Sequence, residues 1–243
     1  MENWKDKFPK KARFYETARG ILYCEDCYEI LQEFPQDSVD LVVIDPPYGV
    51  GIKEKREPNY KDDYFAVDLI DKFLSKILKN NSRFYCFIAQ KTLVETIKGF
   101  RSFELHQILI AYYPNFVGGG KRTYDFTHNY DFILDFHKGK PCPLRRTPGM
   151  GGNSSVLRYP LPQSNYKKEK RFHVNQKPLG LLKHIISASC EDNFIVLDCF
   201  SGVGTTLLAC ELLGLRWIGV ERERIYCEFF KQRISKVLCK KFL

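Results

Sequence analysis

The chain has 243 residues, 44% of them hydrophobic, a length and composition that suit one globular domain with a sizeable core. No apolar run reaches the ~18 to 20 residues of a membrane-spanning helix, and the N-terminal MENWKDKFPKKARFYE lacks the apolar centre of a signal peptide. We therefore expect a cytoplasmic protein with no membrane partner, and the net charge of +9 favours a polyanion as its partner.

Short apolar runs alternate with helical patterns along the chain, which predicts an α/β fold: a doubly wound, mostly parallel, Rossmann-like sheet of seven strands. The strand candidates are residues 20–24, 40–44, 83–89, 106–112, 130–137, 194–199 and 216–220. The helix candidates lie between them, at residues 64–78, 91–99, 178–190, 205–213 and 224–238. The whole of residues 1–243 is expected to form a single domain.

The nine cysteines are expected to be reduced thiols, as is usual in the cytoplasm. Cys24 and Cys27 form a CxxC pair after the first predicted strand. A structural zinc site needs a second pair of ligands, and no second pair at that spacing follows. The sequence therefore predicts no metal site.

The stretch VIDPPYGVG, residues 43–51, ends a predicted strand with an aspartate and two prolines. Proline supplies no N–H to a sheet ladder, so the strand must stop there. Asp45 and the carbonyls that follow it are then held at the rim of the sheet. From these residues alone, the rim is either part of an active site or a rigid turn.

Most of the net charge lies in one segment, residues 138–172, which interrupts the alternation and is rich in Pro, Gly, Ser and Asn. It holds nine basic residues and one acid, Glu169, so it carries +8 of the chain's +9. We interpret it as a small target-recognition insertion that contacts a polyanion; a solvated basic loop is the alternative. The candidate DNA-binding residues are Arg145, Arg146, Arg158, Lys167, Lys168, Lys170 and Arg171. A second basic loop, rich in glycine and aromatic residues, lies within residues 112–130.

The stretch FIVLDCFSGVGTTLLACELLGLRWIGVE, residues 194–221, has the pattern of strand, glycine turn, helix and second strand. Gly202 and Gly204 allow backbone N–H groups to approach a ligand at a helix N-terminus, and Glu221 is placed to accept hydrogen bonds from a ribose diol. Together they indicate a nucleoside cofactor. The third glycine of the dinucleotide pattern is missing, which argues against a nicotinamide or flavin.

Three blocks of the chain resemble the signature blocks of the β-class DNA amino-methyltransferases, across roughly residues 20–235. The blocks are ILYCEDCYEILQEFPQDSVDLVVIDPPYG, HVNQKPLGLLKHII and VLDCFSGVGTTLLACELLGLRWIGVE. In this family the Asp-Pro-Pro-Tyr block precedes the glycine block, and the target-recognition region lies between them. The blocks of this chain have the same order. The chain departs from the family's usual pattern at Cys199, where proline is common, and at Val203, where serine is common.

The resemblance implies methylation of an exocyclic nitrogen of a flipped DNA base by S-adenosylmethionine. Asp45 and the Pro46 carbonyl would accept the N–H groups of the target amine, Pro47 would hold them rigid and Tyr48 would stack on the base. The residues implied at the cofactor are Asp26, His173, Lys177, Asp198, Phe200, Ser201, Gly202, Gly204, Thr205 and Glu221. Among these, His173 and Lys177 would meet the carboxylate end of the cofactor, and Asp26 its adenine. The alternatives are an ordinary turn at Asp26 and an ordinary helix entrance at His173 and Lys177.

We expect a DNA adenine-N6 methyltransferase, because Asp-Pro-Pro-Tyr is typical of adenine enzymes in the family, whereas cytosine-N4 enzymes more often have serine in place of the aspartate. An N4-cytosine enzyme is the alternative within the family. From other classes, the alternatives are an oxidoreductase with a nucleoside cofactor and a catalytically silent DNA-binding module. The expected partner is double-stranded DNA, which would bring the protein to the nucleoid; a homodimer and a cognate restriction endonuclease are further candidate partners.

Overall fold

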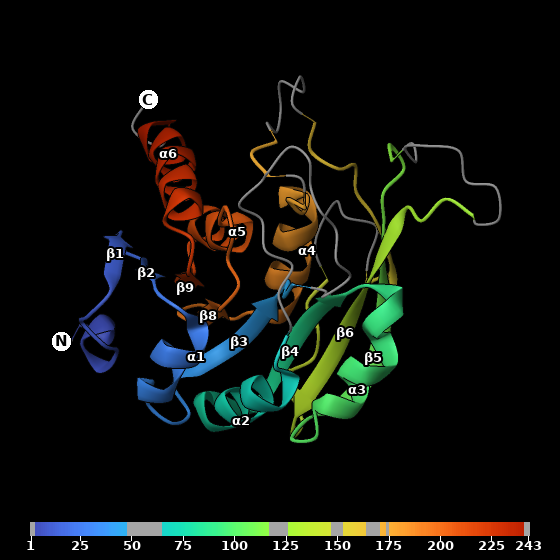
Figure 1. The fold of residues 1–243 in the computed structure, drawn as a ribbon, viewed down its shortest axis with the longest axis horizontal. Helices are drawn as coiled ribbons and strands as arrows, with labels where there is room; N and C mark the ends of the chain where they lie inside the picture. Colours follow the sequence, from blue (N-terminus) through green and yellow to red (C-terminus); the bar gives the residue numbers. More distant parts are fainter. Residues whose placement is uncertain are drawn as a thin grey trace.

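One sheet of nine strands runs through the part of the chain that the computed structural model describes, residues 3–47, 65–116, 126–146, 153–163, 171–173 and 175–240 (Figure 1). The strands are β1 (Arg13–Glu16), β2 (Gly20–Cys24), β3 (Val39–Ile44), β4 (Leu78–Ile88), β5 (Glu104–Tyr112), β6 (Tyr130–Lys138), β7 (Val156–Arg158), β8 (Ile195–Asp198) and β9 (Arg216–Glu221). Their order in the sheet is β1-β2-β9-β8-β3-β4-β6-β5-β7.

The α-helices are α1 (Cys27–Ile30), α2 (Val67–Ile77), α3 (Leu93–Gly99), α4 (Leu179–Ser189), α5 (Thr205–Leu213) and α6 (Arg224–Lys240). Three short 3₁₀ helices, η1 (Trp4–Lys7), η2 (Leu31–Glu33) and η3 (Gln90–Thr92), complete the described elements. In the part of the chain placed by the structure, no helix combines the length and the apolar character needed to cross a membrane.

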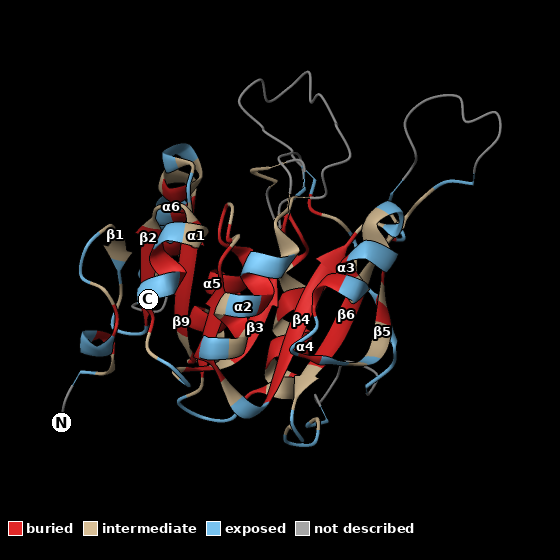
Figure 2. Cartoon of the chain, turned by 60° about the horizontal axis from the view of Figure 1, so that its bottom comes forward, coloured by how far each residue is buried: buried red, intermediate tan, exposed pale blue. Residues whose placement is uncertain are grey.

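Helices cover both faces of the sheet, as the doubly wound prediction requires. Side chains from α1 and α2 pack with one set of strand residues, while side chains from α4, α5 and α6 pack with the set that points the other way. Alternate strand residues therefore enter different cores: Val42 and Ile44 of β3 face α2, and Leu41 and Val43 face α4 and α5. The buried residues, red in Figure 2, are concentrated in the sheet and on the inner sides of the helices.

All the predicted strands and helices are present, but the predicted number of strands, seven, was wrong. The structure adds β1, which pairs antiparallel with β2, and β7, which pairs parallel with β5. Both are short strands at the two edges of the sheet, and three or four residues are too few for an alternating pattern. Because β7 lies inside residues 138–172, that segment is not simply a loop: part of it extends the sheet.

The strand order places a crevice between β3 and β8. These strands are parallel neighbours, with Leu41 opposite Val196 and Val42 opposite Leu197. The chain leaves β3 for α2 on one face of the sheet and leaves β8 for α5 on the other. Loops that depart in opposite directions from adjacent carboxyl ends leave an opening between them, which is where open α/β sheets bind ligands.

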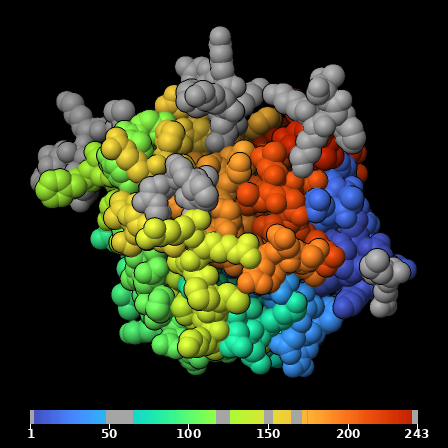
Figure 3. Space-filling model, turned by 180° about the vertical axis from the view of Figure 1, so that it is seen from behind, coloured from blue at the N-terminus to red at the C-terminus, as the bar shows by residue number. Residues whose placement is uncertain are grey.

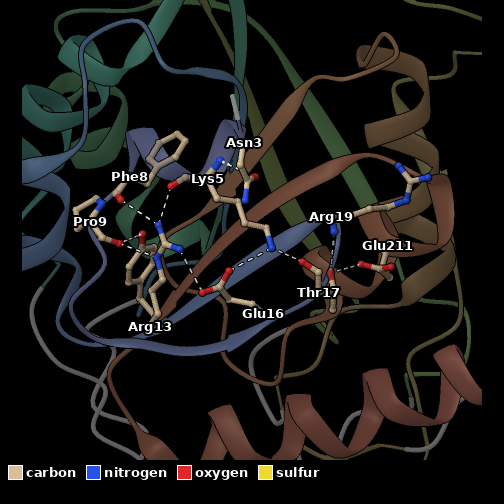
Figure 4. Close-up of polar contacts among 10 residues, drawn as sticks. Asn3, Lys5, Phe8, Pro9, Arg13, Glu16, Thr17, Arg19 and Glu211 are labelled. Carbon is tan, nitrogen blue, oxygen red and sulfur yellow. Dashed lines mark hydrogen bonds and ion pairs between the residues drawn. The ribbon is translucent and has the colours of Figure 1, made fainter. Parts of the chain in front are cut away.

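The N-terminal segment covers the outer side of β2 through polar contacts (Figure 4). Arg13 donates to the carbonyl oxygens of Lys5, at 2.6 Å, and Phe8, at 3.0 Å, while the ammonium group of Lys5 contacts the Glu16 carboxylate at 3.2 Å. The Thr17 hydroxyl continues this network to the buried Glu211 of α5, at 3.0 Å. These contacts protect a strand that would otherwise be an open edge.

Candidate active site

A cavity of about 190 Å³ lies at the carboxyl edge of the parallel strands. All of the predicted cofactor residues except Gly204 line it, and so do Asp45, Pro46 and Pro47. They come from the loops after β2, β3, β8 and β9 and from the segment before α4. Tyr48 lies outside the described residues. The structure thus brings the predicted catalytic rim and the predicted cofactor residues into one cavity.

The glycine turn between β8 and α5 has the backbone shape for which the sequence pattern calls. Gly202 has φ +50° and Gly204 has φ +74°, both in the left-handed region that favours glycine. A Cβ at Gly204 would stand 2.1 Å from the Phe230 ring, whereas a Cβ at Gly202 would meet nothing within 4 Å. Gly204 is therefore required by packing, and Gly202 leaves open space on the cavity side.

Arg233 of α6 fixes this turn, and the sequence reasoning missed it. Its guanidinium group donates to the Val203 carbonyl oxygen at 2.6 Å and to the Thr205 hydroxyl at 3.0 Å, and the side chain is buried. Ile234 and Phe230 are buried on the same helix. An arginine among the apolar positions of a helix was the available signal, because buried cations need partners.

Glu221 is held in place by two backbone amides at the end of β9. Its Oε2 accepts from the Gly202 N–H at 2.7 Å, and its Oε1 accepts from the Glu223 N–H at 2.8 Å. Burial raises the pKa of Glu221 to about 7, against the effect of these hydrogen bonds. Each carboxylate oxygen has two lone pairs, so an oriented Glu221 retains the capacity to accept from ligand hydroxyls.

Asp198 ends β8 as a buried acid that lines the same cavity. Its Oδ1 accepts from the Phe200 N–H at 3.1 Å, and burial raises its pKa to about 7. Asp26 is less buried and caps α1, accepting from the Tyr28 N–H at 2.8 Å. Asp26 is thus a helix cap that also lines the cavity, and its contact with a cofactor adenine stays a prediction.

Lys177 lines the cavity, as expected of a cofactor residue, and it also forms two ion pairs. Its ammonium group lies 2.8 Å from Asp45 Oδ2 and 3.3 Å from Asp131 Oδ2. Burial alone would lower the pKa of Lys177, and the carboxylates of Asp131 and Asp45 outweigh burial and raise it. The lysine of the Gln-Lys-Pro stretch therefore forms an ion pair with Asp45 of the predicted catalytic rim.

Asp131, near the start of β6, is a second residue that sequence reasoning missed. It lies opposite Ala111 of β5, and the Tyr113 hydroxyl donates to its Oδ2 at 2.7 Å. β6 runs antiparallel to β4, so its first residues lie at the edge where β3 and β4 end. An acid at the start of an antiparallel strand gives no local signal of a lysine far along the chain.

His173 packs edge-on against the Tyr226 ring of α6, with 5.0 Å between ring centres. Its Nδ1 accepts from the Asn175 N–H at 3.1 Å, so the ring shapes the approach to α4 while it lines the cavity. His173 therefore lies both at the entrance to α4 and in the cavity wall, and its contact with the carboxylate end of a cofactor stays a prediction.

The four predicted DNA-binding arginines that the structure describes do not all lie together. The Arg145 N–H donates to the carbonyl oxygen of Ala188, in the last turn of α4, and its guanidinium group lies 3.9 Å from Glu191. β6 runs away from the cavity, so the chain after Lys138 begins at the end of the sheet opposite the cavity. Arg146, which follows Arg145 directly, lies at that same end. Figure 3 shows yellow residues of this stretch low on the back of the molecule, beside orange ones. Arg145 and Arg146 therefore lie at the end of the sheet away from Asp45.

Arg158 lies instead at the end of the sheet that holds the cavity, and Arg171 shortly precedes a residue of the cavity wall. Arg158 ends β7, which is parallel to β5, and its guanidinium group is 5.8 Å from the centre of the Tyr112 ring. Arg171 is half-buried and shortly precedes His173, which lines the cavity. Lys167, Lys168 and Lys170 lie outside the described residues. In the described part of the chain, no group of three or more His, Cys, Asp and Glu side chains is arranged to hold a metal ion.

Residues 39–232 match the model of the DNA methylase family of N6 and N4 methyltransferases. The chain belongs to the DNA methylase family. Among its relatives, the type II methyltransferase M2.MboI of Moraxella bovis is 26% identical, with 89% of this chain and 88% of the relative covered. The DNA adenine methyltransferase YhdJ of Escherichia coli is also 26% identical, with 92% of this chain and 85% of the relative covered.

Solved structures of DNA methylases share the fold. The M1.HpyAVI complex with SAM superimposes with a TM-score of 0.66 at 26% identity, covering 87% of this chain and 98% of that one. The cytosine-N4-specific PvuII DNA methyltransferase has a TM-score of 0.75 at 22% identity, covering 91% of this chain and 88% of that one. These likenesses place the chain's nine-stranded sheet among methyltransferase folds and confirm the predicted fold class.

Proposed function

We propose that this DNA methylase transfers a methyl group from S-adenosylmethionine to the exocyclic N6 of an adenine flipped out of double-stranded DNA. The observation that carries the proposal is that the Asp45–Pro46 rim and the Gly202–Glu221 pair line one cavity. A methyl donor and a target amine must meet within bonding reach, and a shared cavity allows that.

The residues around the cavity fit S-adenosylmethionine, the predicted cofactor. Glu221 is oriented by two amides to accept from ribose hydroxyls, and Gly202 leaves the cavity side of the turn open. Phe200, Ser201 and Thr205 complete the wall along the same turn. When bound, the cofactor supplies an electrophilic methyl group on a positively charged sulfur. The buried acid Asp198 gives the wall a negative group that suits a cationic ligand.

The rim supplies hydrogen-bond acceptors that make an exocyclic amine more nucleophilic. The lone pair of the amine is delocalised into the base, so the amine is a poor nucleophile until hydrogen bonds favour a pyramidal nitrogen. The Asp45 carboxylate and the Pro46 carbonyl are two acceptors for the two N–H groups, and their negative charge stabilises the positive charge that grows on the nitrogen. The target must leave the duplex to reach this rim, and Tyr48 is proposed to stack on it.

Adenine is the proposed target because an aspartate, rather than a serine, occupies the position of Asp45. The relative YhdJ, named a DNA adenine methyltransferase, supports this choice. The same pair of acceptors can hold the N4 amine of cytosine, and PvuII methyltransferase, which has the same fold, is cytosine-N4-specific. Cytosine N4 is therefore the second candidate.

The proposal is tested by incubating the purified protein with S-adenosylmethionine and unmethylated bacterial DNA, then digesting the DNA to nucleosides for mass spectrometry. N6-methyladenine is the expected product. N4-methylcytosine in its place would support the second candidate, and neither product would overturn the proposed activity. Sequencing that detects modified bases would then give the recognition site.

A further inference from the structure

Three charged groups from distant parts of the chain stand in a row at the rim. Lys177 Nζ lies between Asp45 Oδ2, at 2.8 Å, and Asp131 Oδ2, at 3.3 Å. The lysine side chain is 9% exposed, and those of Asp45 and Asp131 are 26% and 19% exposed. Charges so far removed from water are screened weakly, so each acts strongly on the others.

The row poses an electrostatic difficulty for the proposed chemistry. Asp45 is proposed to stabilise positive charge on the target amine, yet an ammonium group at 2.8 Å cancels much of its negative field. Asp131 removes the difficulty, because two carboxylates and one ammonium group leave a net charge of −1. Without Asp131, the Asp45–Lys177 pair would be neutral toward the amine.

We infer that Asp131 is a positioning residue of methyl transfer: it takes up the charge of Lys177, so that Lys177 can orient Asp45 without neutralising it. The inference rests on the proposed function. As the amine lone pair forms the new N–C bond, the S–C bonding pair stays on sulfur, and the amine nitrogen is cationic until one of its protons leaves to solvent. The net −1 of the row opposes that transient charge.

Neighbouring side chains hold the row in place. The buried Tyr113 donates its hydroxyl hydrogen to Asp131 Oδ2 at 2.7 Å, and the Lys177 ammonium group lies 5.4 Å from the centre of the Phe87 ring. Tyr113 follows β5, Phe87 belongs to β4 and Asp131 to β6. Asp131 is thus positioned by adjacent strands of the sheet, which is the rigid support that a row of interacting charges requires.

The test compares three variants: Asp131→Asn, Lys177→Met and the double variant. At saturating DNA and cofactor, Asp131→Asn should lower kcat by ~10² or more, in the range seen when one stabilising group is removed from a transition state. Its KM for DNA and its affinity for S-adenosylhomocysteine should stay within about twofold of wild type, because Asp131 does not line the cavity and is inferred to act only through Lys177 and Asp45. The double variant should be faster than Asp131→Asn, since Asp45 is then free of the uncompensated ammonium group.

A merely structural role predicts the opposite order, with the double variant slower than either single one. Asp135→Asn is the matched control: Asp135 is buried on the same strand, pairs with Arg83 at 2.9 Å and lies farther along β6, away from the cavity end of the sheet. That variant should lose thermal stability and keep kcat. An Asp131→Asn enzyme with wild-type kcat, or a double variant no faster than it, overturns the inference while wild-type methylation still supports the proposed function. A wild-type protein that methylates no DNA overturns both.

Discussion

Two buried acids, Asp198 and Glu221, are expected to make ligand binding in the cavity depend on pH. Burial raises the pKa of each to about 7, so near neutrality both exist as mixtures of acid and carboxylate. The ionised forms are the stronger hydrogen-bond acceptors and are the forms that suit ribose hydroxyls and a cationic ligand. Cofactor binding is thus expected to release protons.

Affinity for S-adenosylhomocysteine should therefore rise as the pH increases from about 6 to about 8, because the cost of deprotonating both acids disappears above their raised pKa. Calorimetry across this range gives the measurement. Glu221→Gln should weaken binding at every pH and make the rise shallower. An affinity that does not depend on pH in the wild type would remove these acids from the cofactor site.

Asp45 is proposed to affect the rate of methyl transfer rather than the binding of the cofactor. Asp45→Ala should lower methyl transfer by ~10² to 10⁴, because the target amine loses its charged acceptor. Lys177 keeps Asp131 as a partner at 3.3 Å, so the fold should survive the change. Single-turnover assays at saturating cofactor measure the loss, and unchanged S-adenosylhomocysteine binding is the control. Near-normal activity would exclude Asp45 from the chemistry.

Among the elements, the turn between β8 and α5 contains one glycine that the packing of the fold requires and one that leaves space for a ligand. Gly204 faces the Phe230 ring of α6, whereas Gly202 faces open space. Arg233 secures the same turn from α6. Gly204 therefore allows the turn from β8 into α5 to pack closely against α6, and Gly202 leaves space at the cavity wall.

Substitution of the two glycines by alanine should have different consequences. Gly204→Ala combines a left-handed backbone with a Cβ at 2.1 Å from a ring carbon, and we expect it to lower the free energy of unfolding by ~2 to 4 kcal/mol. Gly202→Ala should cost only ~1 kcal/mol of stability, because only the backbone is strained, yet weaken cofactor binding. Chemical denaturation and calorimetry distinguish the two; equal losses of stability would contradict this division.

The elements were largely predictable because their patterns are local. The helix at residues 205–213 and the strands around Asp45 and Asp198 follow from periodicity, proline and glycine. The partner of Lys177 was not predictable, because Asp131 reaches it only when β6 lies antiparallel beside β4. The position of Arg145 also depends on the antiparallel direction of β6, which takes the following chain away from the cavity. Residues whose neighbours are set by strand order cannot be predicted from one segment at a time.

At the scale of the whole molecule, the basic residues of the 138–172 segment that the structure describes divide between the two ends of the parallel strands. Lys138 binds the carbonyl oxygen of Ser75 at 2.7 Å, and Arg145 lies near Glu191, both away from the cavity. Arg158 lies at the edge where Asp45 and the cavity are found. A duplex whose target base reaches Asp45 would therefore meet only part of this charge.

Salt dependence of DNA binding tests this division. Each phosphate that a basic side chain neutralises adds about −0.9 to the slope of log affinity against log salt. Replacing Arg158 and Arg171 with Gln should flatten the slope by up to ~2 units, because each arginine can neutralise one phosphate. Replacing Arg145 and Arg146 with Gln should leave the slope unchanged and serves as the matched control. A flatter slope after replacement of Arg145 and Arg146 would mean that DNA contacts the end of the sheet away from the cavity.

The pairing of β3 with β8, which forms the crevice, also affects how the molecule folds. Asp40, in β3, accepts a hydrogen bond from the Ile195 N–H at 2.8 Å across 155 residues of chain. Closing so long a loop carries a large entropic cost before any contact rewards it, and such pairings form slowly. The hairpin of β5 and β6 joins residues much nearer in sequence, so it can form before the cavity exists. In refolding experiments, the capacity to bind S-adenosylhomocysteine should then appear after most of the circular dichroism signal has returned.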